Sequence, residues 1–310
     1  MIYTRFLLSM LFVLALLASA ASAQGPVRTF VASTGSDANP CNRTAPCRTF
    51  QAAVDAVAAG GEVVALDSAG FGSNVSITKS VSIIASPGIY AGITVFSGVG
   101  IDINAGAAQD TIILRGLTVI NQSFANLNIG IHLKTGRVLH IESCIVSGFK
   151  NGGFGVNFEP SDSSDLEVKD SIIRDGSTGI WVSGINHALI DQVRLENCNF
   201  RGLVATDGAS VTARNSTASR DAVGFLALCS SASAEMNIEN CVVSNGIDGI
   251  DADSAAPFTA TVRVSNCTVT NNGTGLSNLG TSSVILSRKN NTVQGNEIKT
   301  SGTIGTYSPD

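Results

Sequence analysis

The chain has 310 residues, of which 14% are charged and 5% aromatic, and its formal net charge is −5. This acidic balance argues against a nucleic-acid-binding protein, because such binding draws on clustered Lys and Arg side chains. Beyond the N-terminal segment no stretch has the roughly 20 apolar residues that a membrane-spanning helix requires, so we expect no stable membrane insertion.

Residues 1–23 have the features of a secretory signal peptide. Arg5 precedes an apolar run from Phe6 to Leu17, and the small residues Ala21-Ser22-Ala23 follow it. The run is too short for a membrane anchor, which favours cleavage before Gln24. We therefore expect a secreted protein, located in the periplasm, outside the cell or on the cell surface.

Residues 24–61 are expected to form an N-terminal loop and a capping helix. Cys41 and Cys47 stand close together in the segment NPCNRTAPC, and an exported chain favours a disulfide between them. Thr49 is a suitable N-cap for a helix that ends at Gly60-Gly61. Its apolar face would consist of Phe50, Val54 and Val57. The helix would cover the first coil of the structure that follows.

Residues 62–296 repeat with a period in the twenties. In the later repeats a glycine opens a short strand-like run, and successive glycines are 22 to 26 residues apart. These glycines are Gly130, Gly155, Gly179, Gly202, Gly224, Gly249 and Gly275. Such a period is typical of a solenoid, in which each repeat buries its apolar face against its neighbours.

A second register places a tight bend between two more short strands of each repeat. Polar side chains that tolerate unusual backbone dihedrals occupy the bend, namely Ser143, Asp170, Gln192, Asn215, Asn240 and Asn266. Three strands per repeat predict a parallel β-helix whose coils lie about 4.8 Å apart. The residues before the bend alternate in charge, which indicates a surface charge ladder. The pattern is lost in residues 297–310, which we expect to form a C-terminal tail.

The remaining cysteines fall inside the repeats. Cys144, Cys241 and Cys267 occupy one repeat position, directly after the bend, and we expect them to be stacked core thiols. Cys198 and Cys229 are left unassigned.

The segment RTFVASTGSDANPCNRTAPCRTFQAAVDAVAAGGEVVALDSAGF, followed by these coils, resembles bacterial exported proteins of the pectin-lyase-like superfamily. The resemblance covers nearly all of the mature chain. It implies an all-β fold, a single-stranded right-handed parallel β-helix with an N-terminal capping helix. Members of the superfamily include polysaccharide lyases, glycoside hydrolases, sugar epimerases and adhesive or structural proteins, so the resemblance does not define the activity.

In enzymes of this superfamily the substrate groove lies over one sheet, beside long variable loops. Here the variable loops follow the glycine-led strands, which makes their sheet the candidate binding face. Alternation along these strands predicts two outward rows. The first row is His132, Asn157, Trp181, Val204, Leu226 and Asp251, and the second is Lys134, Glu159, Ser183, Thr206, Leu228 and Asp253.

These rows suggest a sugar-binding surface. Trp181 would offer an apolar plate to a sugar ring, with polar contacts from Asn157, Ser183 and Thr206. His132 or Lys134 could serve as a catalytic base and Glu159 as an acid or base. Alternatively, Trp181, Val204, Leu226 and Leu228 form an apolar strip that the tail, a loop or a second copy covers, which would allow self-association.

Asp248, Asp251 and Asp253 leave open a calcium site, since this cation prefers several oxygen ligands. No other cofactor is indicated.

The catalytic signatures of the related enzymes are missing. The chain lacks the NTD, DD, GHG and RIK motifs of polygalacturonases, the WxDH and paired-arginine pattern of pectate lyases, and the DPHD motif of alginate epimerases. We therefore expect a protein that binds an extracellular or cell-envelope polysaccharide. One alternative is a lyase that cleaves a uronic-acid polymer by Lys- or Arg-assisted β-elimination, with a positive groove near Lys134, Lys150, Lys169 and Arg174. The other is a structural or adhesive envelope protein.

Overall fold

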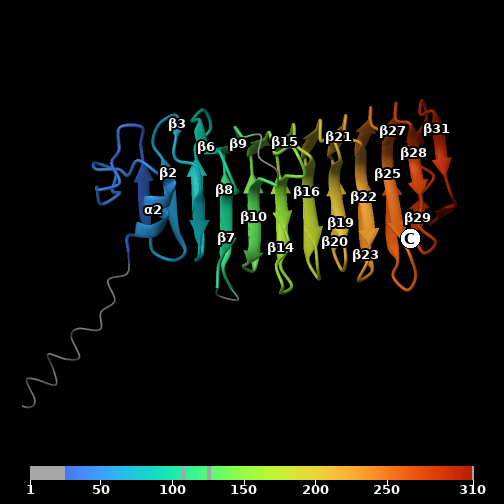
Figure 1. The fold of residues 1–310 in the computed structure, drawn as a ribbon, viewed down its shortest axis with the longest axis horizontal. Coiled ribbons are helices and arrows are strands. Elements are labelled where there is room, and N and C mark those ends of the chain that lie inside the picture. Colours follow the sequence, from blue (N-terminus) through green and yellow to red (C-terminus); the bar gives the residue numbers. More distant parts are fainter. Residues whose placement is uncertain (1–24, 107–108, 124–126, 309–310) are drawn as a thin grey trace, which may run out of the picture.

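The computed structural model describes residues 25–106, 109–123 and 127–308. The predicted signal peptide lies outside these residues. The chain forms a right-handed parallel β-helix, whose coils follow one another along the long axis of the molecule (Figure 1). In the described ranges, no helix is long and apolar enough to cross a membrane.

Each coil contributes one strand to each of three parallel sheets, which we call A, B and C. Sheet A has 12 strands: β1 (Arg28–Val31), β2 (Gly61–Ala65), β5 (Val81–Ala85), β8 (Thr111–Arg115), β11 (Val138–Glu142), β14 (Asp165–Lys169), β17 (His187–Asp191), β20 (Ser210–Arg214), β23 (Ala234–Glu239), β26 (Ala260–Ser265), β29 (Val284–Ser287) and β32 (Ile304–Thr306).

Sheets B and C have 10 strands each. Sheet B contains β3 (Ala69–Gly70), β6 (Ala91–Val95), β9 (Leu117–Asn121), β12 (Ile145–Ser147), β15 (Ile172–Arg174), β18 (Arg194–Glu196), β21 (Thr217–Ser219), β24 (Val242–Ser244), β27 (Thr268–Thr270) and β30 (Thr292–Val293). Sheet C contains β4 (Val75–Ile77), β7 (Val99–Asn104), β10 (Ile129–Thr135), β13 (Phe154–Phe158), β16 (Thr178–Ser183), β19 (Arg201–Thr206), β22 (Val223–Cys229), β25 (Asp248–Ser254), β28 (Thr274–Asn278) and β31 (Ile298–Ser301).

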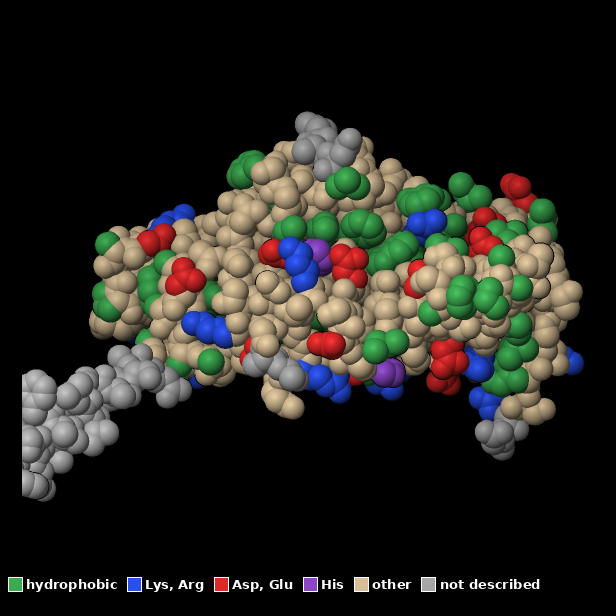
Figure 2. Space-filling model, turned by 60° about the horizontal axis from the view of Figure 1, so that its bottom comes forward, with side chains coloured by type: hydrophobic (Ala, Val, Ile, Leu, Met, Phe, Trp, Pro, Cys, Tyr) green, Lys and Arg blue, Asp and Glu red, His purple; other side chains and the backbone are tan. Residues whose placement is uncertain are grey.

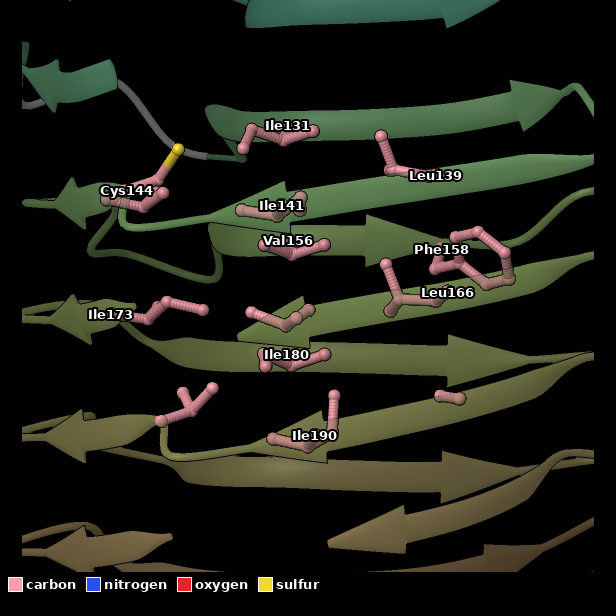
Figure 3. Packing of buried hydrophobic residues seen from close by; sticks show 14 of the residues in the cluster. Ile131, Leu139, Ile141, Cys144, Val156, Phe158, Leu166, Ile173, Ile180 and Ile190 are labelled. Atoms are coloured by element: carbon pink, nitrogen blue, oxygen red, sulfur yellow. The ribbon is translucent and has the colours of Figure 1, made fainter. Parts of the chain in front are cut away.

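The core is built from inward side chains that stack on their equivalents in the next coil. Ile131, Val156 and Ile180 form one such stack in sheet C (Figure 3), and all three are fully buried. Because the strands are parallel and in register, one apolar position per coil becomes a continuous apolar row.

The glycine register marks a bend in sheet C where there is no room for a side chain. A Cβ atom at Gly130 would lie 2.5 Å from the carbonyl oxygen of Gly155, and one at Gly179 would lie 2.5 Å from that of Gly202. The register also begins one coil earlier than predicted, because a Cβ atom at Gly100 would lie 2.7 Å from the Gly130 carbonyl oxygen.

The predicted bend between sheets A and B is confirmed. Its six polar residues have φ angles between 49° and 56°, in the left-handed region that Asn and Asp adopt most readily. Their side chains also bond from coil to coil. The Asn240 amide donates to Asn215 Oδ1 at 2.6 Å, and the Asn266 amide donates to Asn240 Oδ1 at 3.3 Å.

The N-terminal cap is present. Thr49 precedes helix α2 (Phe50–Ala56), and its side chain accepts a hydrogen bond from the Ala52 N–H. Phe50 and Val54 are buried, and Figure 1 shows α2 beside the first strands. Cys41 and Cys47 form a disulfide, with Cα atoms 4.6 Å apart. The helix ends earlier than Gly60, because Val57 already has an extended backbone.

Two predicted boundaries differ from the structure. Residues 24–61 are not only loop and helix, because β1 pairs with β2 and opens sheet A. Residues 297–310 are not only a tail, because β31 pairs with β28 and β32 with β29. Both strands are short and largely exposed, so their sequences lack the apolar pattern of the inner coils.

The stacked thiols are confirmed, since Cys144, Cys241 and Cys267 are buried and unpaired. Cys198 and Cys229 are buried and unpaired as well.

Candidate functional site

The outer face of sheet C carries the two predicted rows in the predicted order. His132 pairs in register with Asn157, Asn157 with Trp181, Trp181 with Val204, Val204 with Leu226, and Leu226 with Asp251. The same pairing places Asp102 before His132 and Ser277 after Asp251. We call this set, from Asp102 to Ser277, the outer row. In the second row, Ser183, Thr206, Leu228 and Asp253 are likewise neighbours.

A polar cluster occupies one end of the outer row. Nε2 of His132 lies 2.8 Å from Glu159 Oε1, and its Nδ1 lies 3.7 Å from Asp102 Oδ1. Lys134 donates to Asp102 Oδ2 at 3.0 Å. The His132 side chain is 8% exposed, whereas those of Glu159 and Lys134 are 46% and 45% exposed. The structure therefore brings together the three residues predicted for acid–base chemistry and adds Asp102 to them.

The outer row also concentrates buried polar atoms that lack hydrogen bonds. Among the described residues, five side-chain atoms are both buried and without a partner, and four of them lie in this row. The four atoms are Asp102 Oδ1, His132 Nδ1, Asn157 Oδ1 and Asp251 Oδ1. Since nearly all buried polar groups in proteins are hydrogen-bonded, this concentration singles out the outer row as a candidate site.

An aromatic group lies beside the polar cluster. The rings of Trp181 and Phe154 meet edge to face, with centroids 5.9 Å apart. The Arg201 guanidinium lies 5.9 Å from the Trp181 ring centroid and 3.9 Å from that of Phe200. Burial lowers the pKa of Arg201 from its usual value, but a guanidinium stays charged near neutral pH. Figure 2 shows one long face of the molecule, where a histidine lies among acidic and basic side chains next to a hydrophobic patch.

Phe154 and Arg201 were missed by the sequence analysis because each stands directly before a register glycine. Simple alternation counts outward from the residue after the glycine, but the bend at that glycine creates a further outward position before it. The signal was present, since Phe154, Thr178 and Arg201 pair in register.

The predicted apolar strip is largely covered within the chain itself. Val204 is fully buried and Leu226 is 5% exposed, whereas Trp181 and Leu228 remain partly exposed. Of the polar residues predicted to contact sugar, Asn157 and Thr206 are buried, and Ser183 is partly exposed. Trp181 and Ser183 are therefore the accessible members of that predicted set.

The three aspartates predicted to bind calcium lie on one strand, β25. Burial, together with the nearby Asp248 and Asp253 carboxylates, raises the pKa of Asp251 to about 8. Asp251 is therefore mostly protonated at neutral pH. In the described part of the chain, no group of three or more His, Cys, Asp or Glu side chains is placed to hold a metal ion. Calcium binding at these aspartates stays a prediction.

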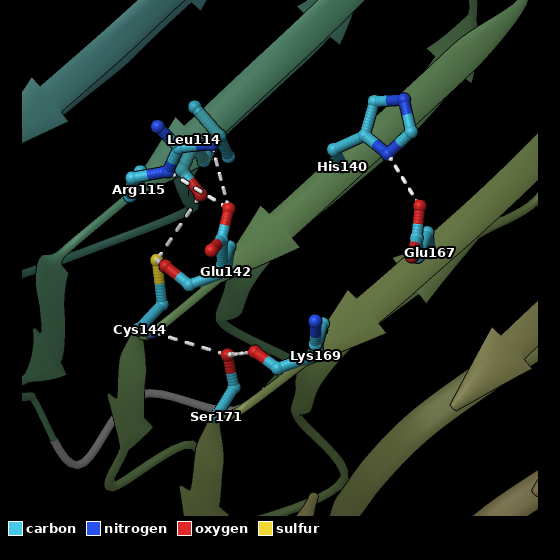
Figure 4. A network of polar contacts seen from close by, with 8 residues as sticks. All are labelled: Leu114, Arg115, His140, Glu142, Cys144, Glu167, Lys169 and Ser171. Carbon is cyan, nitrogen blue, oxygen red and sulfur yellow. Dashed lines mark hydrogen bonds and ion pairs between the residues drawn. The ribbon is translucent and has the colours of Figure 1, made fainter. Parts of the chain in front are cut away.

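A different face, over sheet A, has two adjacent hollows of about 300 and 360 Å³ that share His140 and Glu167. Figure 4 shows how their charged side chains pair between strands: His140 Nδ1 lies 2.9 Å from Glu167 Oε2, and Arg115 contacts Glu142 at 2.7 Å. Further along the same row, Arg214 contacts Asp191 at 2.9 Å. This is the predicted charge ladder, and spaces between its long side chains account for the hollows.

The positive groove expected for a lyase acting on a uronic-acid polymer does not form. Lys169 lies on sheet A, Arg174 on sheet B, and Lys150 in the turn between β12 and β13. Only Lys134 of that set is on sheet C, where it pairs with Asp102. The prediction failed because charged residues close in sequence are distributed over three faces when each coil turns twice.

Comparisons with known proteins agree with this architecture. The pectate lyase Pel9A is similar in structure, with a TM-score of 0.52 and 15% sequence identity, over 91% of this chain and 80% of that one. A GH136 lacto-N-biosidase from Eubacterium ramulus aligns with a TM-score of 0.41 and 9% identity, over 91% and 68%. No curated protein matches the chain. The family model described as the right handed beta helix region matches residues 99–257 and 161–298, more than half of the sequence. The chain therefore belongs to the right-handed β-helix family.

Proposed function

We propose that this protein binds a polysaccharide along the outer row of sheet C. The observation that supports the proposal is the partly exposed Trp181 beside Phe154 and Arg201, next to a row of polar groups that lack partners. A sugar ring has apolar faces and polar edges, and a binding site for it combines an aromatic surface with a few directed polar groups. The similarity in fold to a pectate lyase also favours a polysaccharide-related role.

In this arrangement each part of the site has a separate task. Trp181 stacks against one sugar, with its orientation fixed by the Phe154 ring edge and by Arg201. Ser183 offers a hydroxyl from the second row. The His132–Glu159 pair, one and two coils away, contacts the hydroxyl groups of a neighbouring sugar. A chain laid across the coils would thus meet one strand after another.

The contact between His132 and Glu159 favours acid–base catalysis as a second candidate function. Glu159 is nearly half exposed and is held by a buried histidine, as a positioned general acid or base would be. The test is to incubate the protein with uronic-acid and neutral polysaccharides, with and without calcium, and to follow unsaturated uronate and reducing ends. Product that vanishes in a Glu159→Gln variant supports catalysis, and no product from a folded protein leaves binding alone.

Export is part of the proposal and rests on the first 23 residues. An extracellular or envelope location agrees with the Cys41–Cys47 disulfide, since such bonds persist in oxidising compartments. An adhesive or structural role at the envelope would use the same partly exposed face without selectivity for a glycan.

The binding proposal is tested by replacing Trp181. Trp181→Ala is expected to weaken the affinity for the best polysaccharide of a panel by about 10-fold to 30-fold, about 1.4–2 kcal/mol, because stacking area is lost. The measurement is isothermal titration calorimetry. The matched control is Tyr90→Ala, which removes an aromatic side chain that is 45% exposed before β6 in sheet B. Full affinity in a folded Trp181→Ala variant would sink the proposal.

A further inference from the structure

We infer that the glycan held by sheet C is uncharged, and that polyuronates are disfavoured ligands. This inference rests on the proposed function and narrows its ligand class. It follows from the charges on the outer face of sheet C and from the partners that those charges already have.

Carboxylates outnumber cations on this face. The acidic side chains are Asp102, Glu159, Asp248 and Asp253, and the basic ones are Lys134 and Arg201. Asp251 is left out of this balance because it is mostly protonated at neutral pH. With His132 counted as neutral, the face has a net charge of about −2. A polymer that carries one carboxylate on every sugar would therefore be repelled over the length of the site.

The two cations are not equally available. Lys134 is bonded to Asp102 at 3.0 Å, so it would have to give up this partner to bind an incoming carboxylate. Arg201 forms no ion pair within the described ranges, but it lies over the rings of Phe200 and Trp181. A single half-buried guanidinium can neutralise only one carboxylate of a repeating polyanion.

The position of the carboxylates strengthens this point. Asp102 and Glu159 lie on the N-terminal side of Trp181, and Asp248 and Asp253 lie two strands beyond Arg201 on the other side. A polyanion stacked on Trp181 and extended in either direction meets a carboxylate within a few coils. An uncharged glycan meets hydrogen-bond acceptors at the same places, and carboxylates accept strong hydrogen bonds from sugar hydroxyls.

The experiment compares polymers that share a backbone and differ in charge. The probes are fully methyl-esterified pectin with polygalacturonate, hydroxyethyl cellulose with carboxymethyl cellulose, and the propylene glycol ester of alginate with alginate. Affinity is measured at about 0.02 M and 0.5 M NaCl, because salt screens charge repulsion. In at least one pair the neutral member is expected to bind at least about 10-fold tighter at low salt, and this ratio should shrink at high salt.

A variant links the ratio to named side chains. Asp248→Asn combined with Asp253→Asn removes two carboxylates with little change in shape, so the ratio between neutral and charged members should fall. The matched control is Glu142→Gln, which removes a carboxylate from the charge ladder on sheet A and should leave the ratio unchanged.

The outcomes separate the inference from the proposed function. Tighter or equal binding of the charged members overturns the inference, while the polysaccharide-binding proposal stands. An unchanged ratio in the double variant also overturns it, because the selectivity would then arise elsewhere. If no member of any pair binds the folded protein, the proposed function fails and the inference fails with it.

Discussion

Asp221 occupies a buried turn position that asparagine fills in later coils. Its Oδ1 accepts a hydrogen bond from the Cys198 N–H at 2.7 Å, while its Oδ2 has no partner. Asn272, two coils later, accepts from the Gly246 N–H at 3.0 Å and also donates to the Val243 carbonyl oxygen at 3.2 Å. Burial raises the pKa of Asp221 to about 7, so the carboxyl group binds a proton more readily in the folded protein than in the unfolded chain.

This raised pKa gives a stability prediction with a defined sign. The unfolded pKa is about 3.9, so between about pH 4 and pH 7 the folded state binds more protons, and the free energy of unfolding falls as the pH rises. Asp221→Asn removes this loss and supplies the missing donor. We expect the variant to be more stable than the parent at pH 8 by up to about 4 kcal/mol, and much less so at pH 4. Urea unfolding at both pH values measures the difference.

Asp207→Asn is the opposite control. Although burial opposes it, hydrogen bonds from the Ser230 and Ser231 N–H groups lower the pKa of Asp207 to about 2. Its stabilisation is therefore present above the unfolded pKa and is lost as the pH falls toward 2, so the variant should lose stability at pH 8. A loss of stability in both variants at pH 8 would contradict the assignment of Asp221.

Among the elements, the strands of sheet C depend on their glycines for close contact between coils. In Gly224→Ala the new Cβ would lie 2.4 Å from Val243 Cγ1 and 2.6 Å from the Gly249 carbonyl oxygen. Backbone cannot move away as a flexible side chain can, so we expect a loss of about 1–3 kcal/mol in the free energy of unfolding. Gly70→Ala is the control, because its Cβ would have no neighbour within 4 Å. Equal stability of the two variants would refute a packing role for the glycines.

The same strands show what the sequence can predict. Equal spacing and strict alternation gave the neighbours His132, Asn157 and Trp181, because parallel in-register coils convert spacing into contact. Asp102 was missed because the turn before Ile129 lengthens its repeat, so that Gly100 is 30 residues from Gly130 and falls outside the period. The burial of Val204 could not be predicted, since it depends on side chains and loops that do not repeat.

For the whole molecule, the stacking of coils separates the N-terminal cap from the candidate site. Strands pair only with the strands of adjacent coils, so most stabilising contacts are between nearest neighbours. Helix α2 lies at one end of this row and Trp181 near its middle, several coils away. Damage at the cap should therefore remain local unless the coils unfold as one cooperative unit.

Two buried phenylalanines test this separation. Phe50 in α2 packs against Phe71 with centroids 5.1 Å apart, and Phe225 lies in β22; both are fully buried. Replacement of either by Ala should cost about 3–5 kcal/mol locally. By hydrogen–deuterium exchange, Phe50→Ala should expose β1, β2 and β4 while β16 to β25 stay protected, and glycan affinity should persist. Phe225→Ala should expose β19 to β25 and abolish binding. Uniform deprotection by both variants would instead mean that the cap and the site fold as one unit.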